Sequence, residues 1–417
     1  MISKPEFQSN GGIYLFHWKP EGIKIRIDRL LEDSKLTVAA EVTVTAEEQG
    51  EWLILHRARL NLTSTNSQTA FTKKLTSVKN KDKQKLEVDW ATIIGQASVK
   101  TLDWYRQGEP VITLGQLNPI PAVEWLVYPI IVKGEHNILF GDGGTGKSYI
   151  ANFLALLVQF NYACLDLVPQ QGNVLFLDWE ADRETLERRT FALKQGLGIQ
   201  EKKSFLYRFC EQPLPYDIEQ IRSIVIDNNI SLVIADSAGM AAGVDGEYHS
   251  TAIKYIRALR TLRTTVLSID HIAKNEGSVP FGSVYKRNLA RSAFEIKHSQ
   301  HPGQQDLYVG LFHRKMNEGK LQEPMGFHIH FEGQDPGGVT VEKQDILSVP
   351  ELADGLTLKE RARKELSSGA MSVEALADAL QGSEQTIRRI LYRYRNKLFI
   401  QLEGGYWGLL SEQEELL

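Results

Sequence analysis

The sequence contains few cysteines and no long hydrophobic run. Its 417 residues include only Cys164 and Cys210, which cannot form a framework of several disulfides or a four-thiolate zinc site. No segment approaches the roughly 20 consecutive apolar residues of a membrane-spanning helix. The first residues also lack the apolar core of a secretory signal. We therefore expect a soluble, cytoplasmic protein.

The sequence also lacks an excess of charge of one sign. Lys and Arg number 48 against 52 Asp and Glu, which gives a net charge of −4, so no global positive field draws the chain to nucleic acid. Any DNA binding must depend on local basic clusters. The hydrophobic fraction of 42% is that of a globular protein, and the length suffices for two or three domains.

Residues 1 to about 70 alternate apolar and polar side chains with a period near two. The clearest runs are Ile23–Ile27, Leu36–Val44 and Leu53–Leu60. This alternation predicts strands with one face exposed to water, and hence a small antiparallel β domain over residues 1–85 that docks DNA or a partner protein. The lysine-rich stretch from Lys73 to Lys85 indicates either a solvated linker or an arm that contacts phosphates.

Apolar residues recur at helical spacing after this lysine-rich stretch. They predict a helical linker over residues 86–120, formed by one helix that is either continuous or broken near Gly95. Residues 121–345 then alternate short apolar runs, such as Asn137–Phe140 and Leu232–Ala235, with amphipathic segments. Continuous apolar strands separated by helices are typical of an α/β fold with a parallel sheet buried on both faces.

Residues 141–148, GDGGTGKS, match the phosphate-binding pattern G-x-x-x-x-G-K-[ST]. A predicted strand precedes them and an apolar helix follows, which is the context that this motif requires. The backbone N–H groups of such a loop converge on phosphate at a helix N-terminus. The residues predicted to bind ATP are Gly141, Gly143, Gly144, Thr145, Gly146, Lys147, Ser148 and Tyr149. Lys147 is expected to reach the β and γ phosphates, and Ser148 is expected to ligate Mg²⁺.

Acidic residues follow the predicted strand at 173–177. Ligands of open α/β sheets bind at the carboxyl ends of strands, so an acid at this position can activate the water that attacks the γ phosphate. Glu180 is the predicted base and Asp178 the weaker candidate; alternatively, Glu180 only caps the next helix. Arg188 and Arg189 on that helix are interpreted as surface charge.

Polar residues also end the next two predicted strands. Asp236 follows the buried run Leu232–Ala235, which is the position of an acid that holds Mg²⁺, the Walker B role. His271 ends the strand at 266–269, where a polar side chain can sense the γ phosphate.

Four ordered blocks resemble the RecA-like ATPases related to the RepA-type hexameric replicative helicases of plasmids. They are the P-loop, VLFLDWEADRETLERR at 174–189, LVIADSAGMAAG at 232–243, and SIDHIAK at 268–274 followed by Gly282-Ser283. The resemblance spans residues 121–333. The plasmid proteins are essentially this core alone, whereas the present chain has additional segments at both ends.

The resemblance implies roles for individual residues. Glu180 resembles the family's catalytic glutamate, Asp236 its Walker B acid, and His271 the histidine that relays nucleotide state towards the DNA-binding loops. Arg291 resembles the arginine finger that enters the site of a neighbouring subunit, so the active form is expected to be a homo-oligomer, a ring of six.

The same resemblance places other residues between copies or towards DNA. Lys315 and Asn317 match a K-x-N element near the subunit interface, and Lys315 is therefore counted with the nucleotide-binding residues. Lys286 and Arg287 lie in a region that faces the central channel of such rings. They are candidate DNA contacts, with ordinary solvated surface as an equal alternative.

Residues 356–417 are predicted to form a winged-helix domain. Helices are expected at Leu358–Leu366, Val373–Leu380 and from Ser383 to Lys397, followed by a hairpin around residues 403–405. The third helix carries the basic residues Arg388, Arg389, Arg393, Arg395 and Lys397. In winged helices this element enters the major groove, so DNA contact is favoured over docking of a protein.

Two classes of function fit these features. The first is a hexameric, ATP-hydrolysing DNA helicase or translocase that acts in replication or in the processing of mobile elements. The second is a nucleotide-switched DNA-binding adaptor, or a loader that docks its partner through residues 1–85, without processive unwinding. ATP and Mg²⁺ are the expected cofactors in both.

Overall fold

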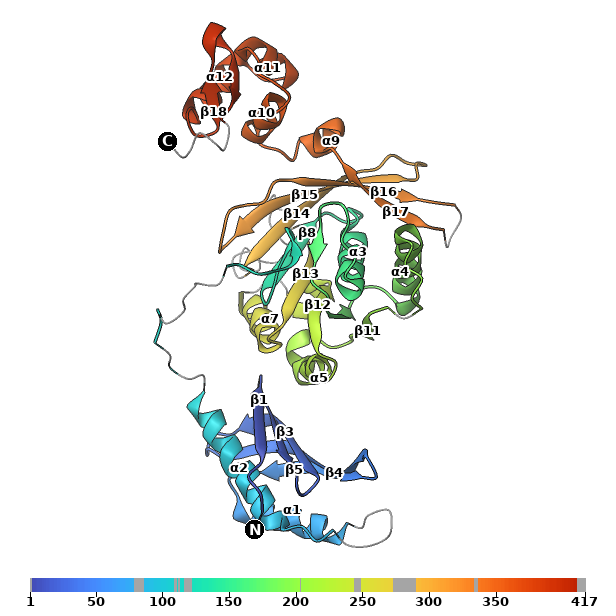
Figure 1. Cartoon of the computed structure of the whole chain (residues 1–417), viewed down its shortest axis with the longest axis vertical. Coiled ribbons are helices and arrows are strands. Elements are labelled where there is room, and N and C mark those ends of the chain that lie inside the picture. Colours follow the sequence, from blue (N-terminus) through green and yellow to red (C-terminus); the bar gives the residue numbers. More distant parts are fainter. Residues whose placement is uncertain are drawn as a thin grey trace. The chain divides into compact units, whose positions relative to one another are not determined.

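A computed structural model describes residues 2–78, 86–108, 111, 113–115, 122–202, 204–243, 249–272, 290–333 and 337–410. The chain divides into two compact units, residues 1–121 and residues 122–417 (Figure 1). Within the described ranges, no helix is both long enough and apolar enough to cross a membrane.

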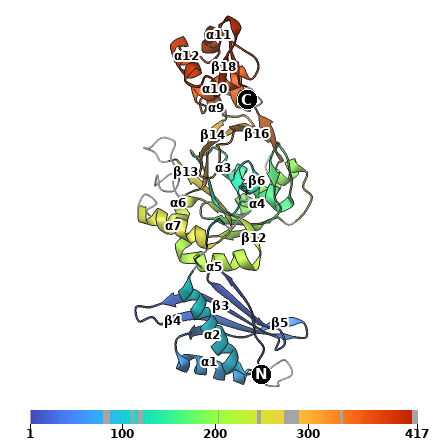
Figure 2. The same cartoon turned by 60° about the vertical axis from the view of Figure 1, so that its left-hand side comes forward.

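The first unit is an antiparallel sheet of five strands in sequential order. The strands are β1 (Glu6–Asn10), β2 (Ile13–Trp18), β3 (Ile23–Glu32), β4 (Val38–Glu48) and β5 (Glu51–Asn61). Two helices follow, α1 (Thr65–Ser77) and α2 (Trp90–Gln107), and lie along the sheet (Figure 2). The period-two alternation buries one face of β3 and β4 and leaves the other face polar, as the sequence predicts.

The region predicted to be a linker differs from the expectation. Trp90, Ile93 and Ile94 of α2 are buried in the same hydrophobic cluster as the sheet, so α2 is a continuous helix that belongs to the first unit. The sequence shows its apolar stripe but not the surface that the stripe covers. Lys73 and Lys74 also lie within α1, so this part of the lysine-rich stretch is helix and not linker.

The second unit contains a nine-stranded sheet in the order β11-β10-β12-β13-β8-β14-β15-β16-β17. The six strands from β11 to β14 are parallel neighbours, and β15, β16 and β17 extend the sheet in antiparallel fashion. The strands are β8 (His136–Gly141), β10 (Asn173–Asp178), β11 (Leu206–Phe209), β12 (Ile230–Asp236), β13 (Thr265–His271), β14 (Ser292–Ser299), β15 (Asp306–Met316), β16 (Met325–Phe331) and β17 (Val339–Gln344). A small sheet, β7-β6-β9, consists of β6 (Trp125–Tyr128), β7 (Ile131–Val132) and β9 (Val168–Pro169).

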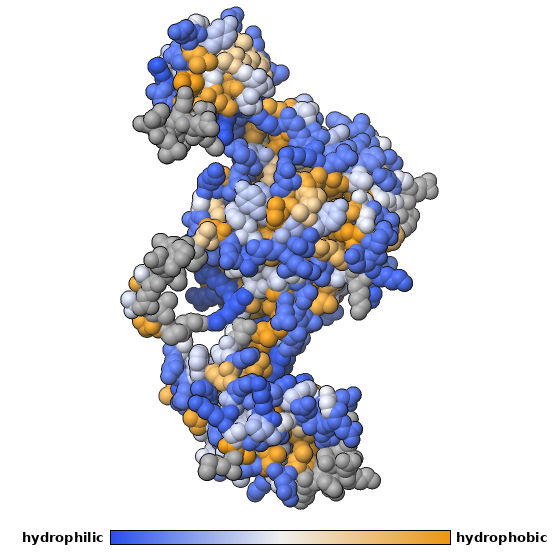
Figure 3. Space-filling model, in the orientation of Figure 1, coloured by the Kyte–Doolittle hydropathy of each residue, from blue (hydrophilic) through white to orange (hydrophobic). Residues whose placement is uncertain are grey.

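Helices cover both faces of the parallel part of the large sheet. The helices α3 (Lys147–Phe160) and α4 (Arg183–Leu197) pack on one face, and α5 (Leu214–Asp227), α6 (Ala238–Ala242) and α7 (His249–Thr261) pack on the other. Alternate residues of the strands enter the two clusters, so the strands are apolar throughout, as predicted for an α/β core. Hydrophilic residues cover most of the face shown in Figure 3.

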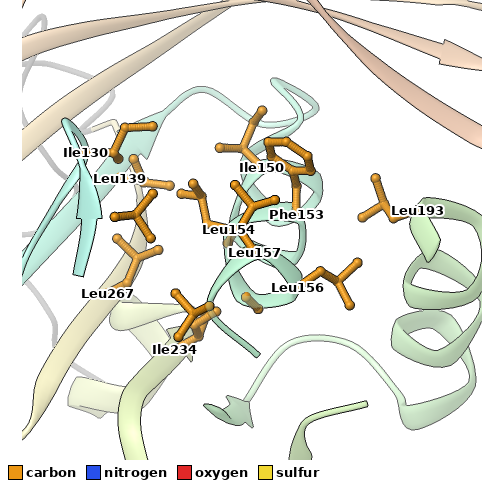
Figure 4. Packing of buried hydrophobic residues seen from close by; sticks show 14 of the residues in the cluster. Ile130, Leu139, Ile150, Phe153, Leu154, Leu156, Leu157, Leu193, Ile234 and Leu267 are labelled. Atoms are coloured by element: carbon orange, nitrogen blue, oxygen red, sulfur yellow. The ribbon is translucent and has the colours of Figure 1, made fainter. Parts of the chain in front are cut away.

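The helix α3 is the centre of the larger hydrophobic cluster. Leu154 and Leu157 of α3 lie towards Leu139 and Leu267 of the sheet, and Leu156 lies towards Leu193 of α4 (Figure 4). This packing fixes the helix that begins at the P-loop.

Helix α4 also makes a close backbone contact with β17. A Cβ atom added at Gly196 would lie 2.0 Å from the carbonyl oxygen of Val339, a distance that no side chain tolerates. Only glycine therefore allows α4 and β17 to approach this closely.

The C-terminal segment of the second unit contains a short 3₁₀ turn, several helices and a two-stranded antiparallel sheet. The elements are η1 (Ile346–Ser348), α9 (Pro350–Ala353), α10 (Leu358–Leu366), α11 (Val373–Ala379), α12 (Glu384–Arg393), β18 (Phe399–Gln401), η2 (Glu403–Gly405) and β19 (Trp407–Leu409). Three of the helices and the hairpin share one hydrophobic cluster around Ile387, Leu391 and Trp407. The helix α12 ends at Arg393, four residues before the predicted end, because Tyr394 leaves helical geometry (φ −111°, ψ 16°). Asn396 then takes a left-handed conformation (φ 59°) that a helix cannot continue.

Candidate nucleotide site

The loop between β8 and α3 has the geometry of a phosphate cradle. Gly141 ends β8, and a Cβ at this position would lie 2.5 Å from the carbonyl oxygen of Ile296 on β14. A larger residue would therefore push the loop away from the sheet. Gly143 lies in the loop, and Gly144, Thr145 and Gly146 line a cavity of about 310 Å³ in front of α3. The loop thus presents backbone N–H groups at the N-terminus of a buried helix.

Lys147 lies at the first position of α3 and is buried. Its Nζ donates hydrogen bonds to the carbonyl oxygens of Gly141 (3.0 Å) and Asp142 (2.5 Å). Burial lowers the pKa of Lys147, and the carboxylates of Asp236 and Glu180 act in the opposite direction. The ammonium group is therefore held inside the loop, where a bound phosphate would replace its backbone acceptors.

Ser148 and Asp236 form a direct hydrogen bond at the end of β12. The Ser148 hydroxyl donates to Asp236 Oδ2 at 2.8 Å. Burial raises the pKa of Asp236 to about 6, although the Ser148 hydrogen bond lowers it. Mg²⁺ prefers oxygen ligands and carboxylates, so this pair of adjacent oxygen donors fits the predicted metal position.

Glu180 follows β10 and faces His271 at the end of β13. His271 Nε2 lies 3.6 Å from Glu180 Oε1, and both side chains are partly exposed to solvent. Hydrogen bonding from His271 lowers the pKa of Glu180, against the effect of burial. Glu180 is therefore an anion at neutral pH, as a base that accepts a proton from water must be.

Asp178, the weaker candidate for the base, is buried and has a different role. Its Oδ1 accepts the backbone N–H groups of Glu180 (3.0 Å) and Ala181 (2.9 Å). Both hydrogen bonds fix the turn that presents Glu180. In this geometry Asp178 positions Glu180, and of these two residues it is Glu180 that lines the cavity.

The sequence interpretation missed five residues of the pocket, namely Arg189, Ile269, Gln300, Leu307 and Phe331. Arg189, interpreted as surface charge, and Phe331 of β16 line the cavity together with Tyr149. The Arg189 guanidinium lies 4.8 Å from the Tyr149 ring centroid, and the Phe331 ring meets Tyr149 edge-on at 5.3 Å. The same three residues line an adjacent cavity of about 390 Å³. Stacked cationic and aromatic groups of this kind suit a planar base.

The position of Arg189 on α4 carries a signal that could have been found. Thr185, Arg188, Arg189 and Ala192 line the adjacent cavity, and their spacing is that of one helix face. No local signal exists for Phe331, because it enters the pocket from a strand distant in sequence.

Arg291 lies outside the pocket of its own chain. It immediately precedes β14, and its backbone N–H donates to the carbonyl oxygen of His136 at the start of β8. The P-loop begins at the other end of β8, about 16 Å away at ~3.3 Å per residue. The Arg291 side chain is 43% exposed, and its Nε lies 3.5 Å from Glu135.

Lys315, which the resemblance places near the subunit interface, does not line the described pocket of its own chain either. Its Nζ donates to the carbonyl oxygen of Ala290 at 2.5 Å. The backbone N–H of Asn317 donates to the carbonyl oxygen of Arg291 at 3.0 Å. Antiparallel pairing of β14 with β15 brings Lys315 beside Arg291, so both lie at the amino end of β8, where the sequence alone could not place them.

The candidate DNA contacts are divided between a described and an undescribed part of the chain. Arg388, Arg389 and Arg393 are exposed on α12, while Ile387 and Leu391 face the core. Lys286 and Arg287 lie outside the described residues.

Residues 107–277 match a protein family described as an AAA domain. This match covers less than half of the chain and ends before β14. It suggests ATPase activity and implies binding of a nucleotide, usually with Mg²⁺. Comparison with curated proteins gave no match.

Among solved structures, a KaiC-like protein from the hyperthermophilic archaeon Pyrococcus horikoshii is similar. It shares 16% sequence identity at a TM-score of 0.38 and covers 52% of this chain and 93% of its own. The family match, the P-loop after β8 and the mostly parallel sheet fit a RecA-like P-loop ATPase core.

Proposed function

We propose that the protein is an ATP-hydrolysing motor that assembles into a ring and acts on DNA as a helicase or translocase. One observation carries this proposal. Lys147, Ser148, Asp236 and Glu180 share one pocket, whereas Arg291 and Lys315 lie together at the amino end of β8, away from that pocket. A second copy that presents Arg291 and Lys315 to the pocket would complete the site.

The residues of the pocket divide the chemistry among them. Lys147 and the loop N–H groups bind the phosphates, and Ser148 with Asp236 holds Mg²⁺, which would neutralise charge on the phosphate oxygens. Glu180 accepts a proton from the attacking water. His271 lies 3.6 Å from Glu180. It is positioned to change its contact with Glu180 when the γ phosphate leaves.

An arginine from a neighbouring copy would supply the missing positive charge. Such a residue stabilises the charge of the transition state and accounts for ~10³–10⁵-fold in turnover. Arg291 suits this role because its side chain is partly exposed, and its ion-pair distance to Glu135 is long. Hydrogen bonds to His136 and Asn317 hold its backbone. They keep the side chain at the amino end of β8.

Three exposed arginines of α12 support contact with DNA. Glu384 Oε2 accepts a hydrogen bond from Arg388 at 3.4 Å, and it is the acidic residue in the first turn of the helix. The helix packs with α10, α11 and the β18–β19 hairpin, an arrangement that fits the predicted winged helix. Contacts of this kind with phosphate weaken steeply as salt rises.

The same three arginines also favour the second candidate, a nucleotide-switched DNA-binding adaptor. In that case α12 holds the protein at a site on DNA, and ATP controls assembly without processive unwinding. Strand-separation assays distinguish the two functions: ATP turnover without unwinding, together with sequence-selective binding that is lost without residues 356–417, favours the adaptor.

A subunit-mixing experiment tests the shared pocket. Lys147→Ala removes phosphate binding and Arg291→Ala removes the finger, so each pure variant should be inactive in DNA-stimulated ATPase assays. An equal mixture should recover activity, because about a quarter of head-to-tail interfaces join an intact loop to an intact finger. Arg59→Ala, an exposed arginine of the first unit, is the control and should retain full activity. A mixture that stays inactive, with a monomeric mass in ATP, contradicts the proposal.

A further inference from the structure

Three side chains that can ligate a metal lie together on β15 and β16. They are Asp306, His328 and His330, and one ligand atom from each lies within 4.8 Å of the others. None of them lines the nucleotide cavities, and the match to the AAA domain ends before this region. The cluster is therefore separate from the ATP chemistry.

Strand geometry places the three side chains on one face of the sheet. Phe327, Ile329 and Phe331 pack against the core that contains α3 and α4, so the alternating residues His328 and His330 point to the opposite face. Antiparallel pairing sets Asp306 directly across from His330. The backbone ladder thus fixes two imidazoles and a carboxylate without any loop.

The hydrogen bonds of the cluster select which atoms face one another. Asp306 Oδ1 lies 2.7 Å from His328 Nε2 and 2.8 Å from His330 Nδ1. All three groups are partly buried, with side-chain exposures of 21–36%.

A second carboxylate lies close to His328 on the neighbouring strand. Glu342 of β17 pairs with His328, and its Oε2 lies 3.8 Å from His328 Nδ1. The Tyr308 ring stacks on His328 at a centroid distance of 4.8 Å. A carboxylate beyond the ligand nitrogen and a ring that fixes the imidazole plane are the usual supports of a metal-bound histidine.

We propose that Asp306, His328 Nε2 and His330 Nδ1 bind a zinc ion, with Glu342 as a positioning residue. Two imidazoles and one carboxylate are ligands that zinc accepts, and three protein ligands leave one position for water or an external group. Mg²⁺ prefers all-oxygen sites, so the two metals would occupy different places in the molecule.

Zinc at this position would cross-link the strands that carry part of the nucleotide pocket. The ion joins β15 to β16, and Phe331 at the end of β16 lines both nucleotide cavities. We expect zinc to raise the thermal stability of the second unit. The site itself requires neither hydrolysis nor DNA binding.

The test measures zinc in the full-length, nucleotide-free protein. After treatment with chelator and dialysis against zinc, elemental analysis should find one tightly bound ion per wild-type chain. Asp306→Asn and His330→Gln should lose it, whereas His301→Gln, a solvent-exposed histidine of the loop before β15, and Asp236→Asn should retain it. Circular dichroism establishes that each variant is folded.

Two further measurements separate a zinc site from a hydrogen-bonded cluster. Cobalt(II) in place of zinc should give visible absorption bands in the wild type and not in Asp306→Asn. Glu342→Gln should keep one ion but weaken its binding by roughly 10- to 100-fold. A wild-type protein without stoichiometric zinc, or equal zinc content in Asp306→Asn and wild type, overturns the proposal.

Discussion

The two ends of strand β8 differ in how they are built. At its carboxyl end, Gly141 leads into a loop whose functional residues are consecutive in sequence. At its amino end, Arg291 and Lys315 meet only because β14 pairs with β8 and β15 pairs with β14. The first end lines a cavity within its own chain, whereas Arg291 and Lys315 line neither of the two nucleotide cavities. In the proposed ring, this amino end would face a neighbouring copy.

Replacing Arg291, at the amino end of β8, is expected to lower ATP turnover more than replacing Glu180 in the nucleotide pocket. Arg291→Ala should reduce DNA-stimulated ATP turnover by ~10³–10⁵-fold without weakening nucleotide binding, because the pocket of its own chain lies at the far end of β8. Steady-state turnover and binding of a fluorescent ATP analogue measure the two effects. An equal loss of nucleotide binding would place Arg291 in its own pocket.

Replacing Glu180 tests the carboxyl end. Glu180→Gln should lower turnover by ~10²–10⁴-fold and leave ATP binding intact, since the amide cannot accept the proton of the attacking water. Single-turnover hydrolysis measures this loss. Asp178→Asn is measured alongside as the comparison. Unaltered single-turnover hydrolysis in Glu180→Gln would show that another group is the base.

Replacing Asp236 should change stability and activity in opposite directions. Its folded pKa of about 6 exceeds the unfolded value of about 3.9, so the buried anion destabilises the nucleotide-free protein progressively as pH rises through this interval. Asp236→Asn should therefore raise the free energy of unfolding at pH 7 by at most about 3 kcal/mol and abolish hydrolysis. Urea denaturation without nucleotide measures the gain, which should disappear below about pH 4. A gain that is independent of pH would exclude this explanation.

Replacing one arginine of α12 should have the smallest effect. Arg389→Ala is expected to weaken DNA binding similarly for all sequences and to reduce the salt dependence of affinity by about one unit of slope. Fluorescence anisotropy over a salt series measures this slope, with Arg59→Ala as the control. An unchanged slope would favour the docking of a protein on α12.

The sequence predicts local features well and distant contacts poorly. The P-loop, Glu180 and Asp236 could be identified because each follows its own apolar strand, and the alternation in β3 and β4 predicts the first sheet. The extent of the antiparallel part of the large sheet could not be predicted, because its strands pair across long separations. The position of Phe331 in the pocket and the surroundings of Lys315 depend on that pairing. The packing of α2 on the first sheet was missed for the same reason.

The close contact at Gly196 has a consequence for movement. At Gly196, α4 and β17 meet backbone to backbone, so no side chain at this position can absorb a shift of one against the other. Arg189 and Gly196 lie on the same helix, about two turns apart. A methyl group added at residue 196 would therefore push α4, and with it the guanidinium beside Tyr149, away from β17.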